Sequence, residues 1–443
     1  MVVVCVVTAS EPRPAMYILA DIHFDPDYGT ENSTSDICNT SSSPPYGMTG
    51  CDTPLKLLES ALDDFVRESI NASENIILYL GDAVRHEMKD FEDSSDSASS
   101  RYIEENALIY TITHKMFSTL QAKLNQTSSA RFFHHPSIIS LLGNEDCVPH
   151  YHFLYSTEPS LHPALVQQTK ALVDTGVLSA EEGAMYGRCA FYSRVVAKTN
   201  LKIIAINTIL YSVQLKPKHQ SSADPCGQFA WLDSELHAAR AAGQRVMITG
   251  HIVPFAVRWD PTMRDTYREM MMNHSDVISV QWFAHTHMFA FQTFSKEDDA
   301  PPLFDIPAIT PRDGNVPSYI WATFEDQTNF NRSQFTNSSW KVNTIHERFY
   351  NVATSPNTPV WRNSASVFPT SFKEFHPPIS TSSLYKFGVH LLGKPDGSEE
   401  WRQFEDFHFG GQTIIPLTKS KKFKLLCDML TASDTDYRAC RGE

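Results

Sequence analysis

The chain has no apolar run long enough to cross a membrane. A bilayer span needs roughly 18 consecutive apolar residues, and the longest candidate here is the short stretch Val2–Val7. Small residues follow it at Thr8, Ala9 and Ser10. We therefore expect no transmembrane segment, and interpret residues 1–15 as a signal-peptide remnant or a disordered N-terminus.

The eight cysteines include no C-x-x-C pair, which argues against a zinc ribbon and a thioredoxin-like redox motif. Disulfide bonds are the better interpretation, and reduced cysteines in a cytosolic core are the alternative. The glycosylation pattern Asn-x-Ser/Thr occurs seven times, at Asn32, Asn39, Asn71, Asn125, Asn273, Asn331 and Asn337, where roughly three would arise by chance. These features predict a secreted protein, or one in the lumen of an acidic compartment such as a lysosome or vacuole.

An excess of positive charge is also absent, because the formal net charge is −14. This charge disfavours a protein that binds nucleic acids in general or anionic membrane surfaces. Hydrophobic residues make up 42% of the chain and charged residues 20%, which is ordinary for a globular protein. The length of 443 residues suits one large catalytic domain with an appendage.

Short apolar runs alternate with helical stretches over the first two-thirds of the chain, which predicts an α/β fold. Six runs rich in Ile, Val, Leu and aromatic residues are typical of buried strands. They are Tyr17–Ala20, Ile76–Leu80, Ile138–Leu142, Leu201–Ile206, Arg245–Thr249 and Val277–Phe283.

Two amphipathic stripes predict helices that pack on this sheet core. The first starts near Pro54 and carries Leu58, Leu62, Phe65, Val66 and Ser69, and the second carries Ile103, Ala107, Leu108, Ile112, Met116 and Leu120. The segment Phe423–Arg438 predicts a further helix near the C-terminus. We expect a catalytic domain over residues 16–350 and a small, mostly helical C-terminal subdomain over residues 371–443.

Five polar clusters lie just after predicted strands, where side chains from different strands of an α/β sheet converge on a ligand crevice. They are Asp21-Ile22-His23, Gly81-Asp82, Gly143-Asn144-Glu145-Asp146, Gly250-His251 and His285-Thr286-His287. The i, i+2 spacing within the first and last clusters would put both side chains on one face of an extended segment. Carboxylate, amide oxygen and imidazole without thiolate suit Zn, Fe or Mn.

In this order the clusters resemble the pattern of the calcineurin-like metallophosphoesterase superfamily, Asp-x-His, Gly-Asp, Gly-Asn, His and Gly-His-x-His, from about Met16 to Met288. The resemblance implies a β-sandwich flanked by helices and two divalent metal ions, with Zn expected first and Fe or Mn as alternatives. It implies that one ion is held by Asp21, His23 and His287, the other by Asn144, His251 and His285, and that Asp82 bridges them. Ala284 stands where the family has its last glycine.

Longer matches resemble the acid sphingomyelinase-like phosphodiesterases within this superfamily. They are Asp224–Leu232 with Arg245–Pro254, and the Cys51-Asp-Thr-Pro54 segment that opens the first helix. By that similarity we expect the disulfides Cys38–Cys51, Cys189–Cys226 and Cys427–Cys440, with Cys5 and Cys147 unassigned.

One departure concerns the family's Gly-Asn-His, whose His lies near the scissile phosphate, because Glu145 occupies that position here. The endopolyphosphatase branch also lacks this His, and the stretches Gly81–His86 and Gly143–His150 resemble it. His86 matches a His that both branches carry and is our candidate proton donor, with His150 as a weaker alternative. Glu145 could act as an acid only if its pKa were raised.

The sequence therefore predicts a binuclear metal-dependent phosphoric ester hydrolase that cleaves phosphodiester or nucleotide-type substrates. An endopolyphosphatase that cleaves phosphoanhydride bonds is the alternative, and a catalytically silent binding protein is the remaining one. The expected partner is a small phosphate ester, a lipid headgroup or polyphosphate, and no nucleic acid. The oligomeric state is left open.

Overall fold

The computed structural model describes residues 15–33, 36–69, 75–86, 100–128, 136–218, 220–325, 339–372, 375–413, 415–431 and 433–442. The interpretation of the N-terminus falls outside this part of the chain, apart from Ala15, which begins the first strand. Cys5 and the glycosylation sequons at Asn71, Asn331 and Asn337 also lie outside the described residues.

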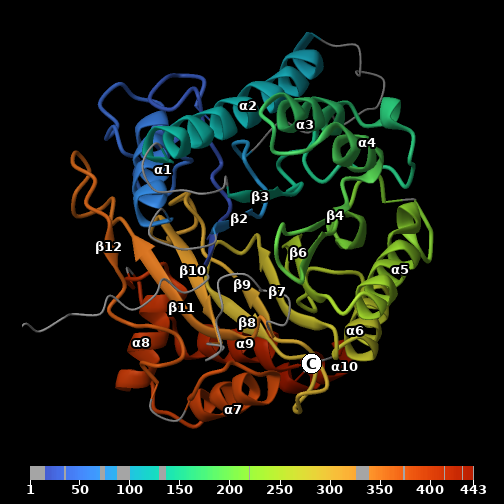
Figure 1. Cartoon of the computed structure of the whole chain (residues 1–443). Coiled ribbons are helices and arrows are strands. Elements are labelled where there is room, and N and C mark those ends of the chain that lie inside the picture. Colours follow the sequence, from blue (N-terminus) through green and yellow to red (C-terminus); the bar gives the residue numbers. More distant parts are fainter. Residues whose placement is uncertain are drawn as a thin grey trace, which may run out of the picture.

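Two six-stranded mixed sheets form the centre of the molecule (Figure 1). The first has the order β12-β11-β10-β1-β2-β3 and the second the order β4-β5-β6-β7-β9-β8. The first comprises β1 (Ala15–Leu19), β2 (Asn75–Tyr79), β3 (Ser137–Ser140), β10 (Ser318–Phe324), β11 (Val342–Phe349) and β12 (Arg362–Asn363). The second comprises β4 (Tyr192–Val195), β5 (Leu201–Ala205), β6 (Arg245–Ile252), β7 (Ile278–Ala284), β8 (Ala290–Gln292) and β9 (Leu303–Asp305).

The six predicted strands are confirmed, and each of them runs parallel to at least one neighbouring strand. β1, β2 and β3 pair in parallel in one sheet, and β5, β6 and β7 do so in the other. Strands of this kind are covered on both faces, so they read in the sequence as continuous apolar runs. Buried side chains from both sheets, such as Ile18 and Ile248, belong to one continuous core. This packing is that of the expected β-sandwich.

Helices flank the sheets (Figure 1). They are α1 (Leu55–Ser69), α2 (Ser100–Ser128), α3 (Pro163–Asp174), α4 (Ala180–Cys189), α5 (Gln228–Ala241), α6 (Pro261–Asn273), α7 (Thr381–Leu392), α8 (Glu399–His408), α9 (Lys419–Leu430) and α10 (Asp434–Arg441). Short 3-10 helices occupy Asp36–Cys38, Pro159–Leu161, Ile209–Tyr211 and Pro225–Gly227. The predicted core stripe of α1 is confirmed, since all five of its residues are buried.

The predicted core stripe of α2 is wrong in its first half. Ile103 is 61% exposed and Ala107 is also exposed, whereas Ile109, Ile112 and Met116 are buried. At about 100° per residue, Ala107 lies roughly 160° around the helix from Ile109. The buried face therefore continues through Ile109, and the sequence pattern had joined residues from two faces.

The C-terminal helices α7 to α10 gather together along one side of the sheets (Figure 1). They contact the core through rings: Phe387 lies 5.6 Å from Phe368, and Phe407 lies 4.6 Å from Phe289, between ring centroids. These phenylalanines belong to the main core cluster. A separate subdomain over residues 371–443 stays a prediction.

The predicted single helix Phe423–Arg438 is wrong, because two helices occupy this region. α9 ends at Leu430 and Thr431 takes an extended conformation, after which Ser433 caps α10 through its side chain. A Ser hydroxyl at this position accepts a backbone N–H that would otherwise have no partner, so it starts a new helix.

All three expected disulfides are present: Cys38–Cys51, Cys189–Cys226 and Cys427–Cys440. Cys147 is a buried free thiol. Three disulfides fit an extracellular or lumenal protein. None of the helices in the described part of the chain has the length and apolar character that a bilayer crossing requires.

Candidate metal centre

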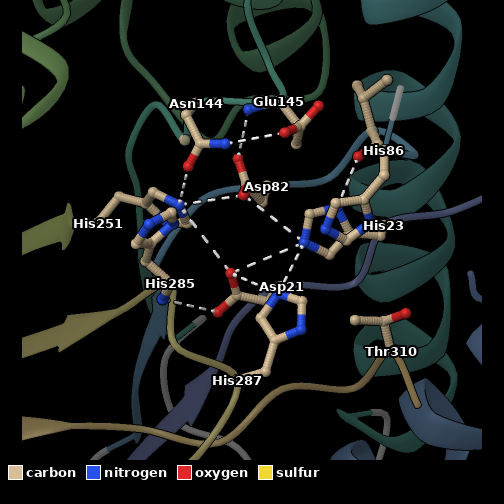
Figure 2. A network of polar contacts seen from close by, with 12 residues as sticks. Asp21, His23, Asp82, His86, Asn144, Glu145, His251, His285, His287 and Thr310 are labelled. Carbon is tan, nitrogen blue, oxygen red and sulfur yellow. Dashed lines mark hydrogen bonds and ion pairs between the residues drawn. The ribbon is translucent and has the colours of Figure 1, made fainter. Parts of the chain in front are cut away.

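Seven side chains converge where the carboxyl ends of the parallel strands of both sheets meet (Figure 2). Asp21 and His23 follow β1, Asp82 follows β2, and Asn144 follows β3. His251 is the penultimate residue of β6, and His285 and His287 follow β7. The structure therefore brings together all of the residues for which the sequence predicted metal ligation.

The backbone at these positions is unusual. Among the described residues, ten non-glycine residues have positive φ, and five of them are predicted ligands: Asp21 (48°), His23 (44°), Asp82 (56°), His285 (82°) and His287 (64°). The extended segments expected for the two i, i+2 pairs are therefore wrong, because the chain turns as soon as each strand ends. Such conformations cost free energy in non-glycine residues and cluster at functional sites.

The ligand atoms form two groups that share Asp82. One group is Asp21, His23 and Asp82, and the other is Asp82, His251 and His285, with the donor atoms of each group within 4.8 Å of one another. Asp82 Oδ2 lies 3.0 Å from His251 Nε2 and 3.5 Å from His23 Nε2.

The two remaining predicted ligands lie at the edges of these groups. His287 Nε2 lies 3.2 Å from His23 Nε2 and 3.6 Å from Asp21 Oδ1. Asn144 Oδ1 lies 3.0 Å from His251 Nε2. His287 therefore joins the group around Asp21, and Asn144 joins the group around His251.

Backbone and side-chain contacts fix how these groups face the centre. His23 Nδ1 pairs with the Val84 carbonyl at 3.0 Å and His251 Nδ1 with the Leu80 carbonyl at 2.7 Å, so each Nε2 points inward. Such partners set the tautomer of a ligating imidazole. The Asn144 amide nitrogen donates to Glu145 Oε1 at 3.0 Å, which turns the amide oxygen toward His251. Glu145 thus has a positioning contact in place of the family's His.

The donor set suits cations and contains an atom that lacks a protein partner. Asp21 Oδ1 is buried and has no hydrogen bond within the described structure, although buried carboxylate oxygens are rarely left unpaired. Burial opposes ionisation of Asp82, but the neighbouring histidines, His251 first, hold its pKa well below the usual range. Burial lowers the pKa of His251 while Asp82 raises it more, to about 10. The field that favours a proton here also favours divalent cations, so the residues fit two metal ions.

His285 is kept neutral by its surroundings. Burial, and then the nearby His251, hold its pKa well below the usual value. The Tyr151 hydroxyl lies 3.2 Å from His285 Nε2. The neutral imidazole is the form that binds metal.

Sequence reasoning gave no role to Asp146, which supports the whole centre. Its carboxylate accepts hydrogen bonds from the backbone N–H groups of Asp82 (3.0 Å), Ala83 (2.9 Å) and Gly143 (2.9 Å). Burial and the charge of Asp82 raise the pKa of Asp146 to about 7. Its place in the Gly143–Asp146 cluster was the available signal, but only the fold shows that it ties two strand ends together.

His86 lies beside the centre and is held by Asp52. Its Nδ1 is 2.7 Å from Asp52 Oδ1 and its backbone N–H donates to Asp52 Oδ2 at 2.9 Å. The ring stacks on His23 with centroids 3.7 Å apart (Figure 2). Burial lowers the pKa of His86, but the charge and hydrogen bond of Asp52 raise it more. His86 also falls within 4.8 Å of the donor atoms of His23 and His287, so its geometry allows ligation as well.

His150, the weaker proton-donor candidate, is engaged differently. Its Nδ1 lies 3.2 Å from Glu145 Oε1, and its side chain is 30% exposed. Its ring packs edge-on against Tyr151. His150 therefore lies on the Asn144 side of the centre, where it contacts Glu145.

Known proteins align with this chain over most of its length. The cyclic GMP-AMP phosphodiesterase SMPDL3A of Homo sapiens is 25% identical over 97% of this chain and 91% of its own. The sphingomyelinase phosphodiesterase D of Dictyostelium discoideum is 26% identical over 64% of this chain and 59% of its own. The endopolyphosphatase of Saccharomyces cerevisiae is 24% identical over 62% of this chain and 40% of its own. No family model matches the chain.

Fold, site and relatives together define a metal-dependent phosphoric ester hydrolase. The chain is similar to acid sphingomyelinase-like phosphodiesterases and to an endopolyphosphatase, which agrees with the resemblance of its motifs to the calcineurin-like metallophosphoesterase superfamily.

Proposed function

We propose that the chain is a phosphodiesterase that acts on nucleotide-type diesters, with two divalent metal ions held by the seven converging side chains. Asp21, His23 and His287 would hold one ion, Asn144, His251 and His285 would hold the other, and Asp82 would be shared between them. The observation that carries the proposal is that Asp82 belongs to both ligand groups. Zn is the proposed metal, with Fe or Mn as alternatives, because the donors are carboxylate, amide oxygen and imidazole.

Bound at these residues, two divalent ions would supply an activated water molecule and charge neutralisation for the phosphoryl oxygens. The protein supplies the fixed geometry. Asp146 holds the amides after β2 and β3, and the backbone N–H of Glu145 donates to Asp82 Oδ1 at 2.8 Å. Asp82 Oδ2 is thereby left to face His251 and His23.

His86 is the proposed donor of the proton that the leaving oxygen needs. Asp52 occupies Nδ1, so Nε2 is the nitrogen that can face substrate. This is the arrangement of a general acid oriented by a second group. Arg312 Nη1 lies 3.4 Å from Asp52 Oδ2 and helps to keep that carboxylate in place.

The pairing of the nearby arginines favours a diester over polyphosphate. Arg85 Nη1 lies 3.0 Å from Asp25 and 2.6 Å from Asp27, and Arg312 is paired with Asp52. Polyphosphate carries a negative charge on every unit, so its binding calls for cations that are not already neutralised. A diester carries a single charge, which two metal ions can balance.

Endopolyphosphatase activity is the second candidate, and the specific observation in its favour is Glu145. This residue stands where the diesterase pattern has a His, and the endopolyphosphatase branch that the sequence resembles also lacks that His. Its Oε1 accepts from Asn144 and lies against His150. A phosphoanhydride bond breaks to release a phosphate, which is a much more acidic leaving group than an alcohol, so its cleavage depends less on an imidazole at this position.

The test is hydrolysis by purified, metal-reconstituted protein of a cyclic dinucleotide, bis-p-nitrophenyl phosphate, sphingomyelin, a nucleoside triphosphate and long-chain polyphosphate, at acid and neutral pH. We expect the highest kcat/KM on a nucleotide-type diester. Polyphosphate as the best substrate would replace the proposal with the second candidate. Activity that survives complete metal removal would reject the two-metal reaction itself.

We also propose that the protein works outside the cytosol, in a secreted form or in an acidic lumen such as a lysosome or vacuole. The three disulfides and the exposed sequons at Asn32, Asn125 and Asn273 support this location.

A further inference from the structure

A second group of histidine and aspartate side chains lies where α5 meets the end of α6, and it shares no residue with the metal centre (Figure 1). Asp233 and His237 are one turn apart on α5, and His274 is the residue that ends α6. His274 Nε2 lies 2.8 Å from Asp233 Oδ1, and His237 Nδ1 lies 3.4 Å from Asp233 Oδ2. The two imidazole rings are 4.8 Å apart between centroids.

The surroundings hold these three residues in place. His274 is 3% exposed, and its backbone N–H donates to the carbonyls of Met270 and Met272. One turn further along α5, Arg240 forms a two-point ion pair with Asp276, with Nε 2.8 Å from Oδ2 and Nη2 2.5 Å from Oδ1. This pair ties α5 to the segment after α6, so a bound ligand would not have to bring the two helices together.

We propose that Asp233, His237 and His274 bind one Zn²⁺ ion, which acts as a clamp between α5 and α6. Two imidazoles and one carboxylate, with water as the fourth ligand, make a typical three-residue zinc site. Two nitrogen donors among three disfavour Ca²⁺ and Mg²⁺, which take oxygen ligands. The donor distances of 2.8 and 3.4 Å resemble the 3.0 and 3.5 Å from Asp82 to its histidines at the metal centre.

One side of the site is exposed to solvent and the other side is buried. The His237 side chain is 61% exposed and that of Asp233 is 49% exposed, which gives the ion a path of entry, whereas His274 is buried. The clamp would fix the position of α6, which connects two strands of the metal centre. β6 before it carries His251, and β7 after it precedes His285. The ion would therefore hold together the support of one half of the metal centre.

The test is the number of Zn²⁺ ions bound by the metal-stripped full-length protein after titration and gel filtration. Wild type should bind one equivalent more than His237→Ala and one more than Asp233→Asn, and Zn²⁺ should raise the Tm of wild type further than that of either variant. His376→Ala is the matched control, since His376 is exposed and belongs to none of the potential ligand groups found among the described residues, and it should bind as wild type does.

The difference of one equivalent between wild type and His237→Ala is the readout, so the result does not depend on how many ions the Asp82 centre holds. Loss of the proposed function at that centre would leave this difference unchanged. Equal stoichiometry and equal Tm shifts in wild type, His237→Ala and Asp233→Asn would overturn the clamp and leave an ordinary His–carboxylate contact. Because the His237 side chain is 61% exposed, its replacement should not impair folding.

Discussion

Replacing His86 with Ala should remove the proton donor and keep the seven ligands. Asp52 lies 2.7 Å from His86 Nδ1, so Nε2 is the nitrogen that can donate a proton to the leaving oxygen. The Ala variant lacks this nitrogen. General acid catalysis is worth roughly 10²–10⁴ in rate, which corresponds to about 2.7–5.4 kcal/mol in the activation barrier. We expect a loss of that size in kcat on a diester with an alkyl leaving group. The loss should be much smaller with p-nitrophenolate, which leaves without needing a proton.

Metal analysis of the same preparation separates this role from ligation, because His86 also lies near the donor atoms of His23 and His287. Asp52→Asn should give a smaller loss with the same dependence on the leaving group, since it removes the charge that raises the pKa of His86 and weakens the hold on the ring but leaves the imidazole in place. His150→Ala should leave that dependence unchanged. Equal losses on both substrates, or a parallel loss of bound metal in His86→Ala, would refute the proton-donor reasoning.

Three further predictions concern the centre and its compartment. Asp82→Ala should lose activity and bound metal together, and two full equivalents retained in elemental analysis would contradict the bridging assignment. Gly143→Ala should also lose metal, because a Cβ there would overlap the Asp82 carboxylate; Gly187→Ala, whose nearest contact would be 3.5 Å, is the control and should bind metal normally. Protein from its native secretory route should show glycans and all three disulfides by mass spectrometry. Unmodified sequons together with free thiols at Cys38, Cys51, Cys427 and Cys440 would contradict the proposed location and indicate a cytosolic protein.

The parallel strands and the convergence of the proposed ligand residues could be predicted from the sequence because both depend on local patterns. A strand buried on both faces must be apolar throughout, as Ile76–Leu80 is. A ligand such as Asp82 must follow directly after such a strand to reach the crevice. The cysteine pairs could be assigned only by resemblance, since eight cysteines by themselves leave the connectivity open.

The support of the centre could not be predicted, because it consists of contacts between residues distant in the chain. Asp52 lies 34 positions from His86, and Asp146 lies 64 positions from Asp82. No local sequence pattern distinguishes Asp52 or Asp146 from an aspartate that is exposed to solvent.

The sequence by itself determined the order and chemical type of the proposed metal ligands, and the apolar runs that place them at strand ends. Only the tertiary structure decided how those side chains are aimed. The positive φ at Asp21 and His285, the buried face of α2 and the break after α9 all depend on what each segment packs against. Periodicity along the chain records that a face is buried, but the free energy of packing and of hydrogen bonding to distant residues selects which face and which backbone conformation are adopted.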